Sequence, residues 1–389
     1  MPKRSHRRPI ILTLTLVSAS ALALAGTLPA SASASAAQHR PTADPVQRGL
    51  DHLVHEDGYP AALAAVTGRD GRARNAVAGV ADLRTGAKAP VDGQVRAASV
   101  TKSFTATAVL QLVGEGKVEL DAPVDTYLPG LLRGDGIDGR RITVRQLLQH
   151  TSGLPDYTQY MDDLVANRHR YHQPRALLDY ALQHKAAFPP GTAWRYCNTD
   201  YLVAGLLIEQ VTGRPAGEEI TRRVIDRVGL QHTYFPAVGD QTIREPHPQG
   251  YVSLKPGEPL LDVTELDPSS AWASGDLIST PSDLNRFFSA LLGGKLLKKD
   301  QLAQMRKTVP IPADADYPKG TRFGLGLSSQ PLSCGGLMWG HDGDYLGYAV
   351  YPSATDDGRA ATIAVTADPG PAKRGRADAY RLLEASICR

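Results

Sequence analysis

Cysteine is scarce in this chain, with 3 among 389 residues, too few for a scaffold held together by several disulfides. One bridge and one spare thiol would suit an oxidising compartment. Cys334 and Cys388 both lie in the C-terminal part, where a bridge would tie down an end that otherwise tends to fray. Cys197 is then the odd residue, and a buried, inert thiol is its default interpretation.

A strong charge of either sign is also missing. The formal net charge is +3, but the first 37 residues hold four basic residues and no acid, so the remainder carries 3 − 4 = −1. A nearly neutral protein lacks the basic surface that binds nucleic acid, so we expect no nucleic-acid partner.

Long apolar runs are absent beyond the N-terminus. Residues 10–25 form an apolar run of about 16 residues, shorter than the ~20 that a membrane-spanning helix needs. The run follows a basic segment and precedes small residues, among which Ala34-Ser35-Ala36 fits a cleavage site. This order predicts a secretory signal peptide over 1–36, and therefore a secreted protein with no stable membrane anchor after signal removal.

The motifs of cofactor-binding proteins are missing as well. No Walker pattern or GxGxxG precedes a helix, which argues against a nucleotide cofactor. His150, His169 and His172 have no HExxH motif or cysteine cluster beside them, and such histidines are more often structural than metal-binding. We expect no metal and no cofactor.

Strand patterns occur at both ends of the chain, with helical patterns between them. After a linker at 37–48, strands are expected at 61–67 and 75–82, joined at Asp70-Gly71. Further strands are expected at 323–327, 337–341, 345–351 and 359–366, and a last helix at 376–386. This pattern predicts an α/β (α+β) fold. One antiparallel sheet, flanked by helices and formed by both chain ends (about 49–98 and 320–389), carries a mostly helical inserted domain (about 99–319).

A serine and a lysine stand three residues apart at Ser99 and Lys102. The apolar residues that follow, at helical spacing, predict a helix that places both side chains on one face, one turn apart. A neighbouring amine can take the proton of a serine hydroxyl and so make it a nucleophile. Alone, the pattern is common, and Ser99 can equally be a helix cap beside a solvated lysine.

Two further segments offer polar groups without being specific by themselves. Tyr196 and Asn198 would project to one side of an extended segment, where a phenol can share a proton and an amide can hold a carbonyl. Gly340–Asp344 lies between predicted strands, and can be either an ordinary turn or a strand edge whose N–H groups bind an oxyanion.

Taken in order, Ser-x-x-Lys, Tyr-x-Asn and a strand motif ending in glycine resemble the penicillin-recognising serine enzymes. The chain is most similar to the class C β-lactamase and D-alanyl-D-alanine carboxypeptidase branch, in particular to a secreted actinobacterial-type DD-peptidase. The resemblance covers roughly residues 45–389. It includes 142–148, 150–154, 323–327, 332–334 with Cys388, and Gly340-His341.

The resemblance implies a β-lactamase-related serine hydrolase domain over 49–389 that works through an acyl-enzyme. Ser99 would attack a carbonyl, while Lys102 and Tyr196 move its proton. A tyrosine needs cationic neighbours to act as a base, and Lys102 and His341 are the candidates. The backbone N–H groups of Ser99 and Asp344 would form the oxyanion hole. The implied substrate-binding residues are Asn198, Trp272, as a pocket wall, His341, Asp342, Gly343 and Asp344.

Two acids depart from the family pattern. Asp342 stands where threonine is usual, and Ser328 and Asp344 stand where close relatives place an arginine and a threonine that receive the substrate carboxylate. Like charges would repel that carboxylate, and would favour an amide, an ester or an amine-bearing peptide.

The resemblance leaves several activities open. A serine-type D-alanyl-D-alanine carboxypeptidase acting on peptidoglycan-type peptides is expected first. The alternatives are a D-stereospecific peptidase, amidase, esterase or β-lactamase, or a non-catalytic penicillin-binding module. We expect a monomer that takes peptide or β-lactam-like substrates.

Overall fold

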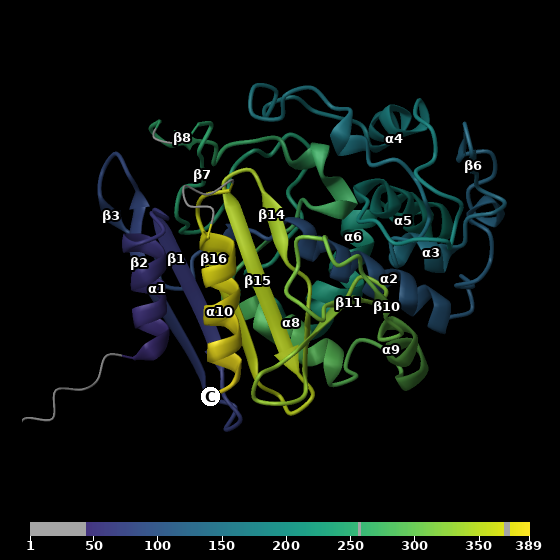
Figure 1. Ribbon diagram of the computed structural model, residues 1–389. Helices are drawn as coiled ribbons and strands as arrows, with labels where there is room; N and C mark the ends of the chain where they lie inside the picture. Colours follow the sequence, from purple (N-terminus) through teal and green to yellow (C-terminus); the bar gives the residue numbers. More distant parts are fainter. Residues whose placement is uncertain (1–43, 256–257, 369–373) are drawn as a thin grey trace, which may run out of the picture. The chain divides into compact units, whose positions relative to one another are not determined.

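The computed structural model describes residues 44–255, 258–368 and 374–389 (Figure 1). The predicted signal peptide at 1–36 and residues 37–43 of the predicted linker lie outside this range. Residues 45–48 belong not to a linker but to helix α1 (Pro45–His55), because Asp44 caps the helix and Pro45 suits its first position. No helix within the described ranges is long and apolar enough to cross a bilayer.

The main sheet joins strands from both ends of the chain, as the sequence predicts. Its members are β1 (Ala61–Thr67), β2 (Ala73–Asp82), β3 (Ala87–Lys88), β10 (Val309–Pro310), β11 (Arg322–Phe323), β12 (Ser328–Pro331), β13 (Leu337–Gly340), β14 (Gly343–Tyr345), β15 (Tyr348–Thr355) and β16 (Ala360–Val365). The order is β10-β11-β12-β13-β15-β16-β1-β2-β3, and β14 pairs with β15 outside this path. β1 pairs antiparallel with β16 and with β2, so the N-terminal strands lie directly beside the C-terminal ones.

Helices cover both faces of this sheet. Alternate residues of β1 enter different cores: Ala62 and Val66 pack with residues of α1 and α10 (Gly375–Ile387), whereas Leu63 packs with residues of the central helices. Figure 1 shows α1 and α10 on the near face of the strands and α8 (Pro281–Leu292) behind them. Because both faces are covered, β1 is apolar along its length rather than alternating.

The middle of the chain is mostly helical. Its other helices are α2 (Thr101–Gly114), α3 (Val144–Leu148), α4 (Pro174–Leu182), α5 (Asn198–Thr212), α6 (Ala216–Ile220), α7 (Asp226–Val228) and α9 (Lys299–Met305). Three small pairs accompany them: β4 (Val95–Arg96) with β9 (Ile278–Ser279), β5 (Arg133–Gly134) with β6 (Ile137–Asp138), and β7 (Tyr251–Val252) with β8 (Leu261–Asp262). Thr143 caps α3 through a capping box, and Gly213 ends α5 in a left-handed conformation.

Two predicted strands are each broken by a turn. Of 323–327 only Phe323 is in a strand, because the chain turns at Gly326, with φ of 68°, before β12 begins. The predicted strand 345–351 is likewise divided at Gly347, with φ of 86°, into the end of β14 and the start of β15. Apolar runs suggested continuous strands, but glycines in left-handed conformations reverse the chain.

Candidate active site

Ser99 lies in a short 3-10 turn, η1 (Ala98–Val100), that leads into α2. Ala98 has a φ of 49°, a left-handed conformation that costs an alanine roughly 1–2 kcal/mol. Such strain persists only where the surrounding structure imposes it, and it is common at functional sites. Lys102 is one turn further, with 3.0 Å between its Nζ and Ser99 Oγ, so the predicted proximity of the two side chains is confirmed.

Lys102 is fully buried and its ammonium group has three acceptors. Nζ donates to Ser99 Oγ at 3.0 Å, and to Asn198 Oδ1 and the Ser274 carbonyl oxygen, both at 2.8 Å. Burial lowers the Lys102 pKa to about 7, against an opposing effect of the nearby Asp156 carboxylate. Near neutral pH, therefore, a substantial fraction of Lys102 is the free amine that can accept a proton.

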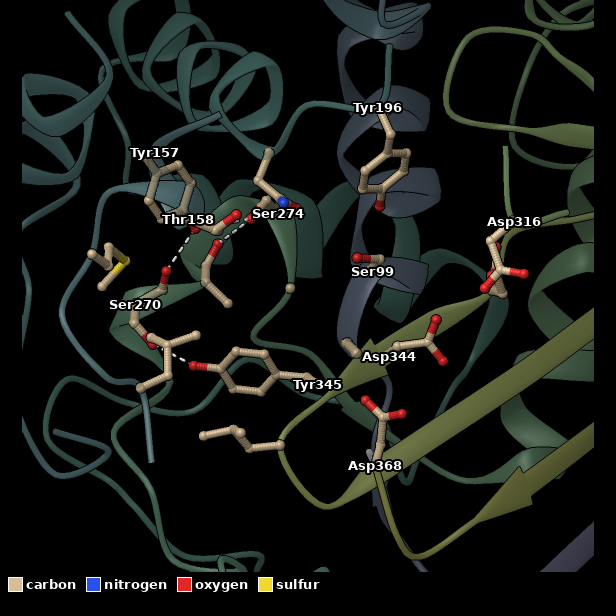
Figure 2. A pocket seen from close by; sticks show the side chains of 18 of the residues that line it. Ser99, Tyr157, Thr158, Tyr196, Ser270, Ser274, Asp316, Asp344, Tyr345 and Asp368 are labelled. Carbon is tan, nitrogen blue, oxygen red and sulfur yellow. Dashed lines mark hydrogen bonds between the residues drawn. The ribbon is translucent and has the colours of Figure 1, made fainter. Parts of the chain in front are cut away.

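Tyr196 points its phenol toward Ser99 (Figure 2). Lys102 Nζ is 5.0 Å from the centre of the Tyr196 ring. Burial raises the Tyr196 pKa well above its usual value, although the contact with Ser99 opposes the shift. The phenol therefore carries its proton in the free enzyme.

His341 does not supply the positive charge that the sequence suggested for Tyr196. Burial lowers the His341 pKa to about 4, so the ring is neutral at neutral pH. Its Nδ1 lies 2.6 Å from the Asp342 carbonyl oxygen, to which it donates. This expectation is corrected: Lys102 is the cationic group beside the phenol.

Asn198 is held from both ends of its side chain. Its Oδ1 accepts from Lys102, while its Nδ2 donates to Asp156 Oδ2 at 2.9 Å. The Asn198 backbone N–H donates to the same Asp156 oxygen at 3.1 Å, where α5 begins. In this arrangement Asn198 orients Lys102, and its expected contact with a substrate amide stays a prediction.

Strand β14 passes very close to Ser99. A Cβ atom on Gly343 would lie 2.2 Å from the Ala97 carbonyl oxygen and 3.1 Å from Ser99 N. Only glycine permits this approach. Gly343 therefore allows the strand edge that carries Asp344 to lie beside the serine, where the predicted oxyanion hole would form.

A cavity of about 510 Å³ opens over Ser99. Figure 2 shows two sides: Tyr157, Ser270 and Tyr345 on one, and Asp316, Asp344 and Asp368 on the other. The lining also includes Met161, Leu164 and Leu346, so the cavity can receive an apolar group. The lining residues that bear on the chemistry are Ser99, Tyr157, Met161, Leu164, Tyr196, Asn198, Ser270, Ser274, Asp316, Asp342, Asp344, Tyr345, Leu346, Asp368 and Arg376.

The second side carries more carboxylates than cations. Arg376 of α10 binds Asp342, with 2.6 Å between Nη2 and Oδ2, and also binds Asp344. Asp316 is exposed and lies 3.7 Å from Arg376 Nε. Burial, assisted by repulsion between carboxylates, raises the pKa of Asp344 to about 6 and that of Asp368 to about 8. Four carboxylates thus share one guanidinium among the cavity residues.

Trp272 does not belong to this cavity. It borders a separate hollow of about 790 Å³ and packs against α5, where Gly205 leaves room for its ring. The backbone of its short helical turn explains the difference, since Ser274 and Gly275 line the active-site cavity while Trp272 and Ala273 line the other hollow. The prediction of Trp272 as a wall of the substrate pocket is therefore corrected.

A histidine and two aspartates that could hold a metal ion lie far along the chain from the serine. His52 Nε2 is 3.9 Å from Asp57 Oδ2 and 3.6 Å from Asp378 Oδ2. Arg374 binds Asp57, and Arg381 binds Asp378, so both carboxylates already have cationic partners. The three histidines considered from the sequence contact different residues: His150 contacts Asp200, His169 contacts Gln241, and the His172 backbone N–H donates to Ser269.

The cysteines follow the sequence prediction. Cys334 and Cys388 form a disulfide, which attaches the end of α10 to the segment before β13. Cys197 is a buried free thiol, and burial raises its pKa well above the usual value. It is therefore a protonated, unreactive group rather than a second nucleophile.

Several residues of the site have no signal in the sequence. Asp156, which holds Asn198, follows the predicted His150–Leu154 motif but belongs to no pattern of its own. Arg376 and Asp368 lie near the C-terminus and reach the cavity only because β16 and α10 pack beside β14 and β15. A single arginine on a helix surface could not be assigned to the site from spacing.

These features agree with comparisons against known proteins. A family model described as Beta-lactamase matches residues 46–387, and the chain belongs to this family. It is therefore a serine hydrolase of the β-lactamase family, with the mixed fold and the terminal-strand sheet of that family.

The most similar solved structures include two amide hydrolases. A D-stereospecific amidohydrolase from Streptomyces sp. is 37% identical, with a TM-score of 0.79, over 88% of this chain and 98% of that one. A D-amino acid amidase from Ochrobactrum anthropi SV3, complexed with L-phenylalanine amide, is 27% identical, with a TM-score of 0.76, over 87% and 97%.

Among curated proteins, penicillin-binding protein 4 of Amycolatopsis lactamdurans is 28% identical over 309 residues, 76% of this chain and 78% of that protein. Penicillin-binding protein 4* of Bacillus subtilis (strain 168) is 26% identical, and the match spans 56% of its length.

Proposed function

We propose that this protein is a D-stereospecific amidohydrolase that cleaves amide bonds through an acyl-enzyme on Ser99. The observation that carries the proposal is the contact of Ser99 with a buried Lys102 of lowered pKa, in a cavity whose other side is rich in carboxylates. Similarity to the Streptomyces D-stereospecific amidohydrolase supports the choice of substrate class.

Acylation begins when the free amine of Lys102 takes the Ser99 proton and Oγ attacks the substrate carbonyl carbon. The resulting oxyanion is stabilised by the N–H groups of Ser99 and Asp344, each contributing about 3 kcal/mol. Tyr196 then donates its phenolic proton to the leaving nitrogen as the C–N bond breaks. The Lys102 ammonium returns a proton to the phenolate, which restores both groups.

Deacylation runs in the opposite sense with water in place of the amine. Water attacks the ester carbonyl and gives a proton to the Tyr196 oxygen as the phenol passes its own proton to the Lys102 amine. The Lys102 ammonium then gives a proton to Ser99 Oγ as the C–O bond breaks. The two steps use the same three side chains, so no further base is required.

The charge of the cavity limits the substrate. A carboxylate beside Asp342 and Asp344 would be repelled, and Arg376, which could bind it, already binds both acids. A free ammonium group would be attracted, and would lower the raised pKa of Asp344 and Asp368. We therefore place amino acid amides and amine-bearing peptides before the carboxypeptidase substrates that the sequence suggested first.

A turnover panel tests this function. The panel contains D-phenylalanine amide, L-phenylalanine amide, N-acetyl-D-phenylalanine amide and a D-alanyl-D-alanine peptide, with Ser99→Ala as control. We expect turnover of the D-amide, at least tenfold less of the L-amide and of the acetylated amide, and none by the variant. Similarity to penicillin-binding protein 4 supports the D-alanyl-D-alanine peptide as a second candidate, and preference for it would overturn the proposal.

Labelling with a fluorescent penicillin tests the nucleophile separately. We expect an adduct on the wild type, with the corresponding mass increase, and none on Ser99→Ala. An adduct on the variant would remove Ser99 from the mechanism.

We also propose that the mature protein acts outside the producing cell, since the N-terminal pattern is that of a secretory signal, and that it is a monomer. Detection of processed protein in the culture medium, followed by its elution volume and light scattering, tests both statements. Retention of an unprocessed chain in the cells, or a stable dimer, would contradict them.

A further inference from the structure

His150 occupies a backbone position that normally belongs to glycine. It follows the end of α3, where its N–H donates to the Leu147 carbonyl and the Thr151 N–H donates to the Gln146 carbonyl. These two bonds form the helix-ending motif that places a left-handed residue at this point, usually glycine. The φ of His150 is 61°, and a histidine there costs about 1 kcal/mol more than glycine would. Some contact of the imidazole must therefore offset this cost.

The contacts of His150 are with the residues on both sides of Tyr196 and with the Tyr196 ring. The Arg195 N–H donates to the His150 carbonyl oxygen at 3.0 Å, and the Cys197 N–H donates to His150 Nδ1 at 3.3 Å. The imidazole and Tyr196 ring centres are 4.5 Å apart. One residue thus holds the backbone on both sides of the tyrosine and packs against its ring.

The imidazole is itself fixed from behind. Its Nδ1 is 3.0 Å from Asp200 Oδ2, and the other Asp200 oxygen accepts a 2.5 Å hydrogen bond from Ser152 Oγ. His150 and Asp200 are fully buried, and burial raises the Asp200 pKa well above its usual value. The single lone pair of Nδ1 accepts from a protonated Asp200 and, more weakly, from the Cys197 N–H at 3.3 Å, which leaves the ring proton on Nε2.

The segment before Tyr196 is a surface loop with few buried residues. Residues 191–193 and Arg195 are exposed, and Trp194 holds the loop by packing its ring against His150 and Phe323. After Tyr196, Cys197 is buried and α5 begins at Asn198. The phenol is therefore attached to a rigid helix on one side and to a surface loop on the other.

We infer that His150, supported by Asp200, is a positioning residue that holds the Tyr196 phenol over Ser99. This rests on the proposed function only in giving Tyr196 the proton transfer to the leaving nitrogen. His150 touches neither substrate nor Ser99 in this role. Its loss would misplace the phenol by a small distance, and a displacement of about 1 Å can cost roughly 100-fold in rate.

The first test is His150→Gly, which removes the imidazole while keeping the backbone carbonyl and relieving the left-handed conformation. Acylation rates are measured in single turnover with D-phenylalanine amide and with the p-nitrophenyl ester of the same amino acid. The ester needs no proton on its leaving group. We expect a fall of about 30- to 100-fold for the amide, under fivefold for the ester, and substrate affinity within about threefold.

A double-mutant cycle then identifies Tyr196 as the group through which His150 acts. In the Tyr196→Phe background, His150→Gly should have almost no further effect on amide acylation, because the phenol it positions is gone. The inference would be overturned if the two substitutions lowered amide acylation by independent factors that multiply. It would also be overturned if His150→Gly lowered amide and ester acylation equally. Asp92→Gly is the matched control, since Asp92 also has a left-handed φ, of 56°, and binds Ser282 outside the cavity.

Substitutions of Asp200, which contacts His150, keep the inference testable if glycine at position 150 destabilises the fold. Asp200→Ala should reproduce the loss of amide acylation, and Asp200→Asn should recover most of it, because an amide can donate to Nδ1 and accept from Ser152. Equal losses in both Asp200 variants, with thermal unfolding unchanged, would contradict the role given to Asp200.

Fluorescent penicillin acylation is measured in parallel, as it requires Ser99 and protonation of a leaving nitrogen whatever the natural substrate is. If D-amides are not turned over but penicillin acylation still depends on His150 through Tyr196, the proposed function fails and the positioning role stands. If D-amides are turned over and the cycle is additive, the positioning role alone fails.

Discussion

Arg376 of the C-terminal helix binds Asp342 of the active-site strand motif, with 2.6 Å between Nη2 and Oδ2. The same guanidinium binds Asp344, two residues further along. Asp342 and Asp344 are therefore both paired with Arg376. The Arg376 guanidinium is then not free to bind a substrate carboxylate. We therefore expect the substrate charge preference to depend on this contact between strand β14 and its preceding motif on one side and the last helix on the other.

Asp342→Thr should shift preference toward carboxylate-bearing peptides. The substitution removes one negative charge and frees the Arg376 Nη2 group that now donates to Asp342. We expect the ratio of activity on a peptide with a free C-terminal carboxylate to activity on its amide to rise about tenfold, equivalent to about 1.4 kcal/mol. Steady-state kinetics on the two substrates measure it.

Asp316→Asn is the matched control for this change. Asp316 also lines the cavity, but its side chain is 94% exposed, so its charge is screened and the ratio should change by less than twofold. An unchanged ratio in Asp342→Thr would show that repulsion by Asp342 does not govern carboxylate rejection.

Activity should rise with pH through about 7, where Lys102 loses its proton. Because the free amine is the base in acylation, kcat/KM should follow a limb with an apparent pKa near 7 in the free enzyme. Lys102→Arg should remove the limb and lower kcat/KM by about 10³-fold, since arginine stays protonated. A wild-type profile flat from pH 5 to 9 would contradict this assignment of the base.

Asp368→Asn should stabilise the folded protein at high pH and have little effect at low pH. The folded-state pKa of Asp368 is raised to about 8, so the folded chain keeps this proton at pH values where the unfolded chain has lost it. Such a group destabilises the fold progressively as pH rises from about 4 to 8. Removing it should increase the free energy of unfolding by on the order of 2 kcal/mol at pH 9 and by almost nothing at pH 4.

Urea unfolding of wild type and Asp368→Asn at both pH values measures this difference. Asp316→Asn serves again as control, because no comparable gain is expected from a largely exposed acid. A gain of the same size at pH 4 and pH 9 would mean that the substitution acts through packing rather than through charge.

Loss of the disulfide should destabilise the chain without altering the chemistry at Ser99. The bridge joins residues separated by 54 positions, and closing such a loop restricts the unfolded state by about 4 kcal/mol. Cys334→Ser with Cys388→Ser should lower the free energy of unfolding by roughly that amount, while penicillin acylation stays within about twofold at 20 °C. If a reductant lowered the free energy of unfolding of this variant by as much as that of the wild type, the stabilisation would not come from the Cys334–Cys388 bridge.

Local pattern was sufficient where the residues concerned lie within one short segment. The serine and lysine are adjacent because helical spacing places them one turn apart. Ala61–Thr67 was predicted at its observed bounds, since a run of seven apolar or β-branched residues between turns is typical of a buried strand. Turns within the apolar runs at 323–327 and 345–351 were missed, because a left-handed glycine has no periodic signal.

The sequence by itself determined the family, the contact between Ser99 and Lys102, and a sheet completed by both chain ends. These follow from short-range spacing and from the order of motifs. Tertiary structure alone decided which charged residues line the cavity, because Arg376 and Asp368 reach it from elements packed beside β14 and β15 rather than from the sequence motifs. It also placed the Trp272 side chain outside the cavity and, through burial, made the His341 ring neutral. Both results depend on neighbouring residues that are distant along the chain.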